Sequence, residues 1–352
     1  MPTSVAPMKV LVTAQAFAVS GQNARSLLEA KQCQLIQSRS WGPLSREQLI
    51  EQALDCDAII AATDPYDAET FESLPKLKLV ARCGVGIDSV HLEDATRSGI
   101  LVSNVPGAMT DAVADYCMGL ILSLARQIHL GYECMQAGGW MEMPGVELRG
   151  KTLGLVGLGQ IGQEVAERSR GFGLTVVAHD PHLPKSLWAA RFPWVESLEL
   201  SELLERSHFV SLHAPNIPQT QNMMNASTLA RMRRDAYLIN TSRGALVDEE
   251  ALIRALHDGT IAGAAIDVYR NEPLPKEHPL RMAPRLLLTP HNAFNSKEAA
   301  IRMSFGCSEP LLDLLNGYIP RHVCNPEVIG SPQFRWPIPL SPKETGHENQ
   351  SR

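Results

Sequence analysis

The chain has 352 residues, 44% hydrophobic and 20% charged, with a formal net charge of -6. Because this length exceeds what one hydrophobic core usually serves, we expect two domains. The composition is that of a soluble globular protein. The net negative charge indicates no basic surface for nucleic acid, so small metabolites are the expected partners.

The cysteines and the apolar runs bear on the compartment. Seven cysteines are scattered without a CxxC motif or a His/Cys cluster at metal-ligand spacing, so we expect no metal site. Such a set in apolar surroundings is expected to be reduced and buried, which suits the cytoplasm. No apolar run reaches the roughly 18 residues that a membrane span needs. The run at 10–19 is mildly apolar and 16–18 resembles a signal cleavage site, but 9–14 fits a first strand better than a signal peptide.

The first hundred residues alternate short apolar runs with amphipathic patterns. Helices are predicted at 23–31 and 46–54, among others. Strands are predicted at 9–14, 33–38, 57–63, 77–84 and 100–107. The alternation favours a parallel sheet with helices on both faces, so residues 1–106 are interpreted as one α/β domain.

A long segment without proline follows at 110–128. It is apolar on more than one face, and Thr110 or Asp111 can cap its start. The pattern predicts a helix buried between domains or subunits, which we interpret as the linker into the second domain.

The strand predicted at 152–156 runs into a glycine-rich turn that opens a helical pattern. The turn reads Gly157-Leu158-Gly159-Gln160-Ile161-Gly162. Gly157 permits the sharp turn, Gly159 lets the backbone approach a pyrophosphate, and Gly162 lets the helix pack close to the strand. The helix start, with Gln160 and Ile161, offers free N–H groups and a positive dipole end to the phosphates. The turn predicts a dinucleotide site, and a purely structural turn is the alternative.

An acidic residue indicates which dinucleotide is bound. The next predicted strand, 174–178, is followed by Asp180, at the place where a carboxylate hydrogen-bonds a ribose 2′-hydroxyl. A carboxylate repels a 2′-phosphate, and no arginine occurs in 179–182. The sequence therefore predicts NAD and not NADP as the cofactor.

The alternation of predicted strands and helices continues to about residue 290. Further strands are predicted at 208–212, 236–240, 262–268 and 286–289, giving the second domain six, as expected of a doubly wound dinucleotide fold. Residues 296–317 then predict a helix that returns to the first domain, and 322–328 a final segment. Residues 331–352 are rich in proline and polar residues and are predicted to be disordered.

Three of these strands end in groups suited to one reaction. Arg243 follows the strand at 236–240, Glu272 follows 262–268, and His291 follows 286–289. Because ligands of such sheets bind beyond the carboxyl ends of the strands, we expect the three side chains to converge there. Each alone has a structural alternative, as a surface ion pair or a loop histidine, and their joint placement favours a catalytic set.

Each group has a role in hydride transfer to a ketone. The guanidinium of Arg243 can fork to the carboxylate and carbonyl of a 2-oxo acid. His291 can supply the proton for the developing alkoxide, and Glu272 can fix the imidazole and favour its protonated form. The cofactor carries the hydride. Asp267, in an otherwise apolar strand, needs a polar partner, and a nicotinamide carboxamide is one candidate.

Together these motifs resemble the D-isomer-specific 2-hydroxyacid dehydrogenases, the family of phosphoglycerate dehydrogenase, hydroxypyruvate/glyoxylate reductase and formate dehydrogenase. The matching segments follow the family's order and cover about residues 57–328. They are 84–88, 99–104, 154–162, 240–248, 265–268 with 272–273, and 289–291.

The resemblance implies a Rossmann NAD domain, 107–292, inserted into a flavodoxin-like substrate domain, 1–106 and 293–330. It implies Arg243, Glu272 and His291 as the catalytic set, with the N–H groups of Val85 and Gly86 on the substrate carboxylate. It also implies a hinge and a homodimer built mainly through the NAD domain. The residues that it places at the cofactor are His213, Ala214, Pro215, Thr220, Thr241, Ser242 and Asp267.

One departure bears on the substrate. Phosphoglycerate-type members carry an arginine in the loop after the third strand, and this chain has Asp64 there. Asp64 is expected to disfavour a phosphate or second carboxylate, so we predict a small 2-oxo acid such as glyoxylate or hydroxypyruvate. The alternative function is an NADH-sensing binding protein, like the corepressors that share this fold and retain the same three residues.

Overall fold

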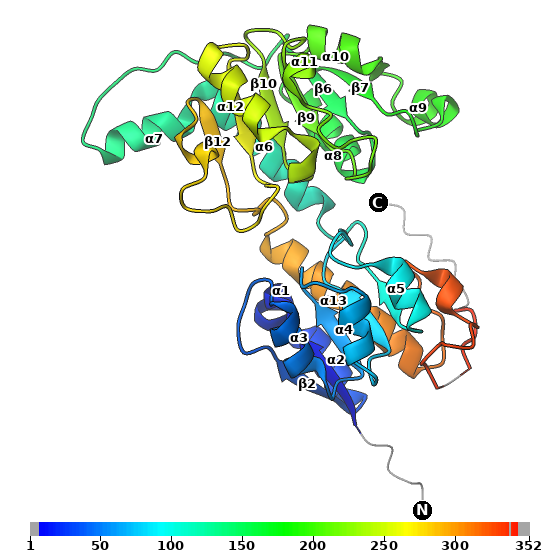
Figure 1. Ribbon diagram of the computed structural model, residues 1–352. Helices are drawn as coiled ribbons and strands as arrows, with labels where there is room; N and C mark the ends of the chain where they lie inside the picture. The colour runs from blue at the N-terminus through cyan, green and yellow to red at the C-terminus, as the bar shows by residue number, and fades with distance from the viewer. Residues whose placement is uncertain (1–6, 338, 344–352) are drawn as a thin grey trace, which may run out of the picture. The chain divides into compact units, whose positions relative to one another are not determined.

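Each of the two units of the chain is built around one parallel sheet (Figure 1). The computed structural model describes residues 7–337 and 339–343. The chain divides into a split unit, residues 1–109 with 296–352, and an inserted unit, residues 110–295. The boundaries expected from the sequence, after residues 106 and 292, lie close to these divisions.

The sheet of the split unit has the strand order β2-β1-β3-β4-β5, and its described strands are all parallel. This order is that of a flavodoxin-like doubly wound sheet, which confirms the predicted fold class. The strands are β1 (Met8–Val12), β2 (Cys33–Gln37), β3 (Ala58–Ala61), β4 (Leu79–Arg82) and β5 (Leu101–Ser103).

Helices cover this sheet and give it a continuous core. The apolar strand β3 is buried along its whole length, as a parallel strand covered on both faces requires. The helix α13 (Lys297–Leu315) packs against α1, α2, β3 and β4, so the chain returns to the split unit as expected. The other helices are α1 (Gln15–Ser20), α2 (Gln22–Ala30), α3 (Arg46–Ala53), α4 (Ala68–Ser73), α5 (Leu92–Arg97) and the 3-10 helix η3 (Pro326–Val328).

The sheet of the inserted unit has the order β12-β11-β10-β9-β6-β7-β8, again with parallel neighbours. Its order reverses between β6 and β9, as in a Rossmann fold. The described strands number seven and not the predicted six, because the exposed edge strand β8 has only two residues and leaves no periodic pattern. They are β6 (Thr152–Val156), β7 (Thr175–His179), β8 (Glu196–Ser197), β9 (Phe209–Leu212), β10 (Tyr237–Asn240), β11 (Gly263–Ile266) and β12 (Leu286–Leu288).

The long predicted helix ends two residues early and lies inside the inserted unit. It is α6 (Thr110–Arg126), which packs against α8, β10 and β11 in the core of this unit, so it is more than a linker. Gln127 then takes a left-handed conformation (φ 54°), and α7 (Ile128–Gln136) begins there. Among the described residues, no helix combines the length and apolarity needed to cross a bilayer.

The remaining helices of the inserted unit complete the two helical layers around its sheet. They are α8 (Gln160–Arg170), α9 (Lys185–Arg191), α10 (Leu200–Arg206), α11 (Ala226–Leu229), α12 (Glu249–Asp258) and the 3-10 helices η1 (Gly244–Leu246) and η2 (Pro279–Met282).

The described part of the C-terminal tail differs from the expectation of disorder. The guanidinium of Arg335 donates to the carbonyl oxygens of Leu74 and Leu77, and its backbone N–H donates to Gly99. Trp336 is 5% exposed. These contacts could not be predicted from the proline-rich composition, because they depend on carbonyl groups far away in the chain. Residues 338 and 344–352 of the predicted disordered tail lie outside the described residues.

Candidate active site

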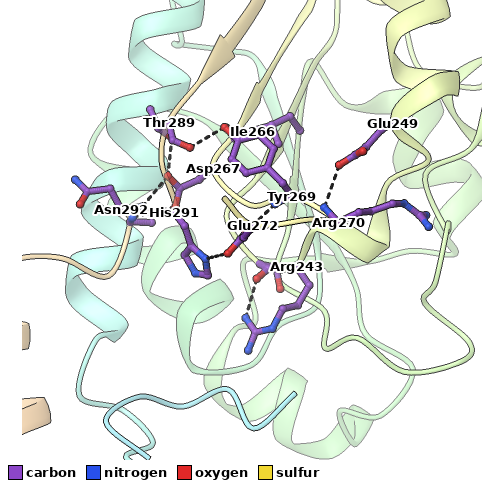
Figure 2. A network of polar contacts seen from close by, with 12 residues as sticks. Arg243, Glu249, Ile266, Asp267, Tyr269, Arg270, Glu272, Thr289, His291 and Asn292 are labelled. Carbon is purple, nitrogen blue, oxygen red and sulfur yellow. Dashed lines mark hydrogen bonds and ion pairs between the residues drawn. The ribbon is translucent and has the colours of Figure 1, made fainter. Parts of the chain in front are cut away.

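The carboxyl ends of β10, β11 and β12 bring three of the predicted side chains together (Figure 2). Arg243 follows β10, Glu272 follows β11 and His291 follows β12. Nδ1 of His291 lies 2.6 Å from Oε2 of Glu272, and the charge of Arg243 also acts on this carboxylate. The structure thus collects an imidazole, a carboxylate and a guanidinium at one edge of the inserted sheet.

The carboxylate of Glu272 is held at both oxygens. Its second oxygen accepts a hydrogen bond from the backbone N–H of Tyr269 at 2.9 Å. Burial raises the pKa of Glu272, but the hydrogen bond and charge of His291 outweigh it and lower the pKa below the ordinary value of 4.5. The ionised carboxylate occupies Nδ1 of His291, so Nε2 is the ring nitrogen left for a reacting group.

A buried carboxylate holds the loop that carries His291. The backbone of His291 is left-handed (φ 49°), and its N–H donates to the Asp267 carbonyl at 2.8 Å. The fully buried Asp267 carboxylate accepts from Thr289 Oγ1 at 2.6 Å and from the N–H groups of Asn292 and Ala293 at 2.9 and 3.0 Å. The chain itself therefore supplies the polar partners for which the sequence suggested a nicotinamide carboxamide.

Close backbone packing fixes the loop that carries Arg243. A Cβ on Gly244 would lie 2.0 Å from the carbonyl carbon of Tyr269, so only glycine lets the loops after β10 and β11 approach this closely. The carbonyl of Arg243 accepts from Asn240 Nδ2 at 2.8 Å, and its guanidinium donates to the Ser242 carbonyl at 2.7 Å.

The three glycines of the turn have two different roles. A Cβ on Gly157 (φ 98°) would lie 2.7 Å from the His213 carbonyl oxygen, and one on Gly162 would lie 2.4 Å from the Gly157 carbonyl oxygen. These two glycines are required by the fold itself. Apart from its two chain neighbours, no described residue has an atom within 4 Å of a Cβ built on Gly159, so this backbone borders open space where a ligand can approach.

The start of α8 and the carboxylate of Asp180 lie beside this turn. The helix begins with Gln160 and Ile161, without a capping side chain and without an acidic residue in its first turn. Such an N-terminus suits an anion. Asp180 accepts from the N–H of Leu158 at 2.8 Å and from the N–H groups of His182 and Leu183 at 3.0 and 3.1 Å. This bonding fixes a carboxylate next to the open glycine, as the dinucleotide prediction requires.

His213 continues β9 as a neutral imidazole. Burial lowers the pKa of His213 to about 4. Its Nε2 lies 3.0 Å from Oγ of Ser211, and that oxygen lies 3.2 Å from Sγ of Cys117 on α6. His213 is thus tied to the core of the inserted unit and carries no charge near neutral pH.

The other predicted cofactor residues lie in the loops after β9 and β10, which hydrogen bonds hold together. Ser242 Oγ donates to the Ala214 carbonyl at 2.6 Å, and Thr220 Oγ1 donates to the Pro215 carbonyl at 2.6 Å. Thr241 is 8% exposed, and its buried Oγ1 has no hydrogen-bond partner among the described residues. An unpartnered hydroxyl between fixed loops fits a site for a polar ligand such as the predicted dinucleotide.

The two predicted substrate-binding backbone groups belong to the split unit. Val85 and Gly86 are partly exposed and follow β4. The Val85 carbonyl accepts from Asn104 Nδ2 at 2.8 Å, and the Gly84 carbonyl accepts from the N–H of Val105 at 3.0 Å. The loop is therefore held to the segment after β5.

The structure shows what surrounds Asp64. This side chain is fully buried. Its carboxylate accepts from Thr13 Oγ1 at 2.6 Å, from the N–H of Leu44 at 2.9 Å and from Tyr66 Oη at 3.1 Å. Because three internal donors occupy its oxygens, Asp64 does not offer them to a ligand. The effect of its charge on a phosphate-bearing substrate stays a prediction.

Two further residues near these strand ends were not predicted from the sequence. The ring of Phe294 packs edge-on against the imidazole of His291, with centroids 5.8 Å apart. The buried Oδ1 of Asn216 has no partner among the described residues. A lone aromatic three residues after His291 in a polar loop was the available signal for Phe294, whereas nothing in the sequence distinguishes Asn216.

Comparison with known proteins identifies what this arrangement is similar to. Residues 118–293 match the family model for the D-isomer specific 2-hydroxyacid dehydrogenase, NAD binding domain. The matched segment contains the glycine turn and the three strand ends described above.

Individual relatives cover most of the chain. The glyoxylate reductase of Korarchaeum cryptofilum (strain OPF8) is 40% identical over 294 residues, 82% of this chain and 88% of that protein. The D-3-phosphoglycerate dehydrogenase of Methanocaldococcus jannaschii is 36% identical over 286 residues, 80% of this chain and 54% of that protein. Among solved structures, the NAD-dependent formate dehydrogenase from Staphylococcus aureus in complex with NAD matches with a TM-score of 0.77 and 31% identity, covering 88% of this chain and 96% of that one.

Proposed function

The chain belongs to the D-isomer-specific 2-hydroxyacid dehydrogenases, NAD-dependent oxidoreductases that act on CH–OH groups, and we propose that it reversibly reduces a small 2-oxo acid of the glyoxylate or hydroxypyruvate type. The observation that carries the proposal is the 2.6 Å pair of His291 and Glu272, beside Arg243 at the ends of neighbouring strands. The glyoxylate reductase names of several relatives support the choice of substrate.

Arg243 and the loop at Val85 and Gly86 position the substrate in this proposal. The guanidinium of Arg243 forks to the carboxylate and the carbonyl oxygen of the 2-oxo acid, which orients it and polarises the C=O bond. The backbone N–H groups of Val85 and Gly86 add neutral donors to the carboxylate. A 2-oxo acid is thus recognised by the two oxygen groups that every member of this substrate class carries.

His291 completes the reaction as the acid. NADH, when bound, supplies the hydride that adds to C2 of the substrate. The electron pair of the C=O π bond moves to the oxygen, and Nε2 of His291 gives that oxygen its proton. In the oxidative direction Nε2 takes the proton back. Glu272 remains ionised throughout, because its pKa is lowered, and it stabilises the imidazolium.

The inserted unit holds the cofactor in this proposal. Gly159 and the N–H groups that open α8 contact the pyrophosphate, and Asp180 accepts from the ribose hydroxyls. Residues 213–215 and Thr220 border the cofactor, and Thr241 offers its unpartnered hydroxyl. Asp267, whose side chain is fully buried, acts by fixing the His291 loop through three hydrogen bonds.

We also propose that the enzyme is a homodimer through the inserted unit. The helix α7 has no buried residue and extends from its unit together with the loop that follows it (Figure 1). Exposed apolar residues recur on it at helical spacing and continue into the loop, and we call this set the apolar arm: Ile128, Tyr132, Met135, Trp140 and Met141. An apolar surface of this extent favours contact with a second copy of the chain.

The proposed setting is the cytoplasm, with small acids as partners and neither nucleic acid nor a membrane. All seven cysteines are free thiols, and five of them are buried. Free thiols suit a reducing compartment, and the net charge of -6 does not suit nucleic acid.

Removal of the proposed acid tests the function. We expect wild type to oxidise NADH with glyoxylate or hydroxypyruvate, and His291→Ala to lose about 10²–10⁴-fold in kcat. The variant should bind NADH as tightly as wild type, measured by fluorescence titration. The matched control is His257→Ala, an exposed histidine of α12 that should keep full activity. Full activity of His291→Ala, or no turnover by wild type across a panel of 2-oxo acids, contradicts the proposal.

A further inference from the structure

Two cysteines of the split unit are in contact, although they lie far apart in the chain. Cys83 directly follows β4, and Cys307 lies on α13, which packs against β4. Both are free thiols, and the S–H of Cys307 is in hydrogen-bond contact with the sulfur of Cys83. Sγ of Cys307 also lies 3.4 Å from the Ser304 carbonyl oxygen. Two sulfurs in contact on separate elements are placed to form a disulfide bond.

We propose that Cys83 and Cys307 form a reversible disulfide when a hydroperoxide oxidises them, and that this bond weakens the binding of the 2-oxo acid. The disulfide site stands on the contact of the two sulfurs, whereas its effect on the substrate rests on the proposed function. Neither thiol takes part in the proposed hydride transfer.

The surroundings of the two thiols differ, and the difference assigns their roles. The hydrogen bond from Cys307 lowers the pKa of the Cys83 thiol, against burial, which raises it. The positive charge of Arg82 and a hydrogen bond from the backbone N–H of Phe17 also stabilise the Cys83 thiolate. Burial raises the pKa of Cys307, which stays a thiol. Cys83 is therefore the nucleophile, and Cys307 is the thiol that reacts second.

The accessibility of the pair favours a small oxidant. Cys83 is 8% exposed, and Cys307 is 1% exposed. A hydroperoxide can reach a sulfur with this little open surface, whereas the disulfide of glutathione needs an open approach along its S–S bond. We therefore expect hydrogen peroxide to oxidise the pair and glutathione disulfide to leave it reduced.

Hydrogen peroxide oxidises the pair in two steps. The Cys83 thiolate attacks one oxygen, the O–O bond breaks, and Cys83 becomes a sulfenic acid. The departing hydroxide takes the proton that the Cys83 thiol had given up and leaves as water. The Cys307 sulfur then attacks the Cys83 sulfur, the S–O bond breaks, and the hydroxyl group leaves as a second water with the Cys307 proton. The two thiols are oxidised to one disulfide, and the peroxide is reduced to two waters.

The disulfide acts on the substrate through the loop 84–86, which Cys83 directly precedes. The first carbonyl of this loop accepts from the N–H of Val105 at 3.0 Å. A Cβ on Gly306 would lie 2.2 Å from Cγ1 of Val105, so α13 already packs as closely as this segment allows. Formation of an S–S bond draws Cys307 toward Cys83, so the helix displaces Val105 and the loop moves with it. The proposed N–H donors to the substrate carboxylate are then misplaced.

Mass spectrometry tests the disulfide, and kinetics tests its effect. Reduced enzyme is treated with hydrogen peroxide or with glutathione disulfide, and the remaining thiols are alkylated in denaturant before digestion. We expect peroxide to give a peptide that joins Cys83 to Cys307. The kcat/KM for glyoxylate should then fall by about 10–100-fold through a raised KM, since a misplacement of about 1 Å costs about 100-fold. NADH affinity should be unchanged, because the inserted unit holds the cofactor, and dithiothreitol should restore activity.

Single substitutions supply the matched controls. Cys83→Ala should form no disulfide and should keep its activity in peroxide. Cys307→Ala should stop at the sulfenic acid of Cys83, which dimedone labels, and should react more slowly because its hydrogen bond is lost. Cys324→Ala removes another free cysteine of the split unit and should respond to peroxide as wild type does.

The outcomes separate this inference from the proposed function. If Cys83 and Cys307 are both alkylated after peroxide treatment, or if Cys83→Ala loses activity as wild type does, the inference is overturned. A disulfide with an unchanged KM overturns its effect on the substrate loop. If untreated wild type reduces no 2-oxo acid, the proposed function fails together with that effect, and the peptides alone then support or overturn the disulfide site.

Discussion

Nδ1 of His291 lies 2.6 Å from Oε2 of Glu272, although 19 residues separate them in the chain. The contact follows from the sheet: β11 and β12 are parallel neighbours, so the loops after them begin at the same edge. Asp267 then fixes the loop after β12 from inside the unit. The pair is thus the result of strand order and one buried carboxylate.

Replacing the charge of this pair tests its role. Glu272→Gln keeps the shape and an oxygen for Nδ1 but removes the negative charge that stabilises an imidazolium. We expect kcat for reduction to fall by about 10–100-fold while NADH binding is unchanged. Steady-state kinetics and a fluorescence titration check both values. Glu277→Gln, at an exposed glutamate of the same segment, is the control, and equal losses in both variants would refute the role of the pair.

The glycine turn predicts two variants that fail in different ways. Gly159→Ala adds a methyl group into open space, so folding should be unaffected, whereas NADH affinity should fall by at least about tenfold because the methyl group blocks the pyrophosphate. Gly162→Ala places its Cβ 2.4 Å from the Gly157 carbonyl oxygen, so it should lower the melting temperature as well. Thermal unfolding and NADH titration separate the two. Unchanged NADH affinity in Gly159→Ala would contradict the cofactor site.

The lowered pKa of His213 predicts a loss of stability in acid. Between pH 6.5 and about 4 the unfolded chain binds a proton at this histidine and the folded chain does not. Stability therefore falls as pH drops through this window, by up to about 3 kcal/mol from this group. Below about pH 4 both states are protonated, and no further loss comes from it.

His213→Gln is the variant that checks this prediction. It should lower the free energy of unfolding at neutral pH by about 1 kcal/mol through the altered bond to Ser211. Its stability should then decline less than that of wild type between pH 6.5 and 4, in urea unfolding at a series of pH values. His257→Gln, at an exposed histidine, should follow the wild-type curve. Identical pH slopes for wild type and His213→Gln would show that His213 titrates normally.

The apolar arm predicts the state of assembly. Tyr132→Asp and Trp140→Asp place a charge on side chains that are 65% and 87% exposed in the single chain. If the arm contacts a second copy, each variant should shift the dimer toward monomer by at least about tenfold in dissociation constant, measured by sedimentation equilibrium. Met282→Glu, at an exposed apolar residue outside the arm, is the control. The proposal would be refuted by a monomeric wild type, or by arm variants whose dimers have the same dissociation constant as the wild-type dimer.

Much of the site was predictable because its signals are local. The turn from Gly157 to Gly162 follows from three glycines at fixed spacing, one in a left-handed conformation and two that allow close approach of a ligand or of the backbone. The Arg243, Glu272 and His291 positions follow from the rule that parallel strands place their carboxyl ends together. Short apolar runs between amphipathic segments were enough to predict both sheets, and only the two-residue strand β8 left no pattern.

The sequence by itself determined the two-sheet α/β class, the dinucleotide turn and the three side chains at the strand ends, because each depends on neighbours in the chain or on its regular periodicity. Only the tertiary structure decided what surrounds the buried carboxylates. Asp64 is bonded to Thr13, Leu44 and Tyr66, and Asp267 to the loop after β12, and none of these partners could be read from the sequence. Hydrogen-bond partners from distant segments have no local pattern, and they exist only once the chain has folded.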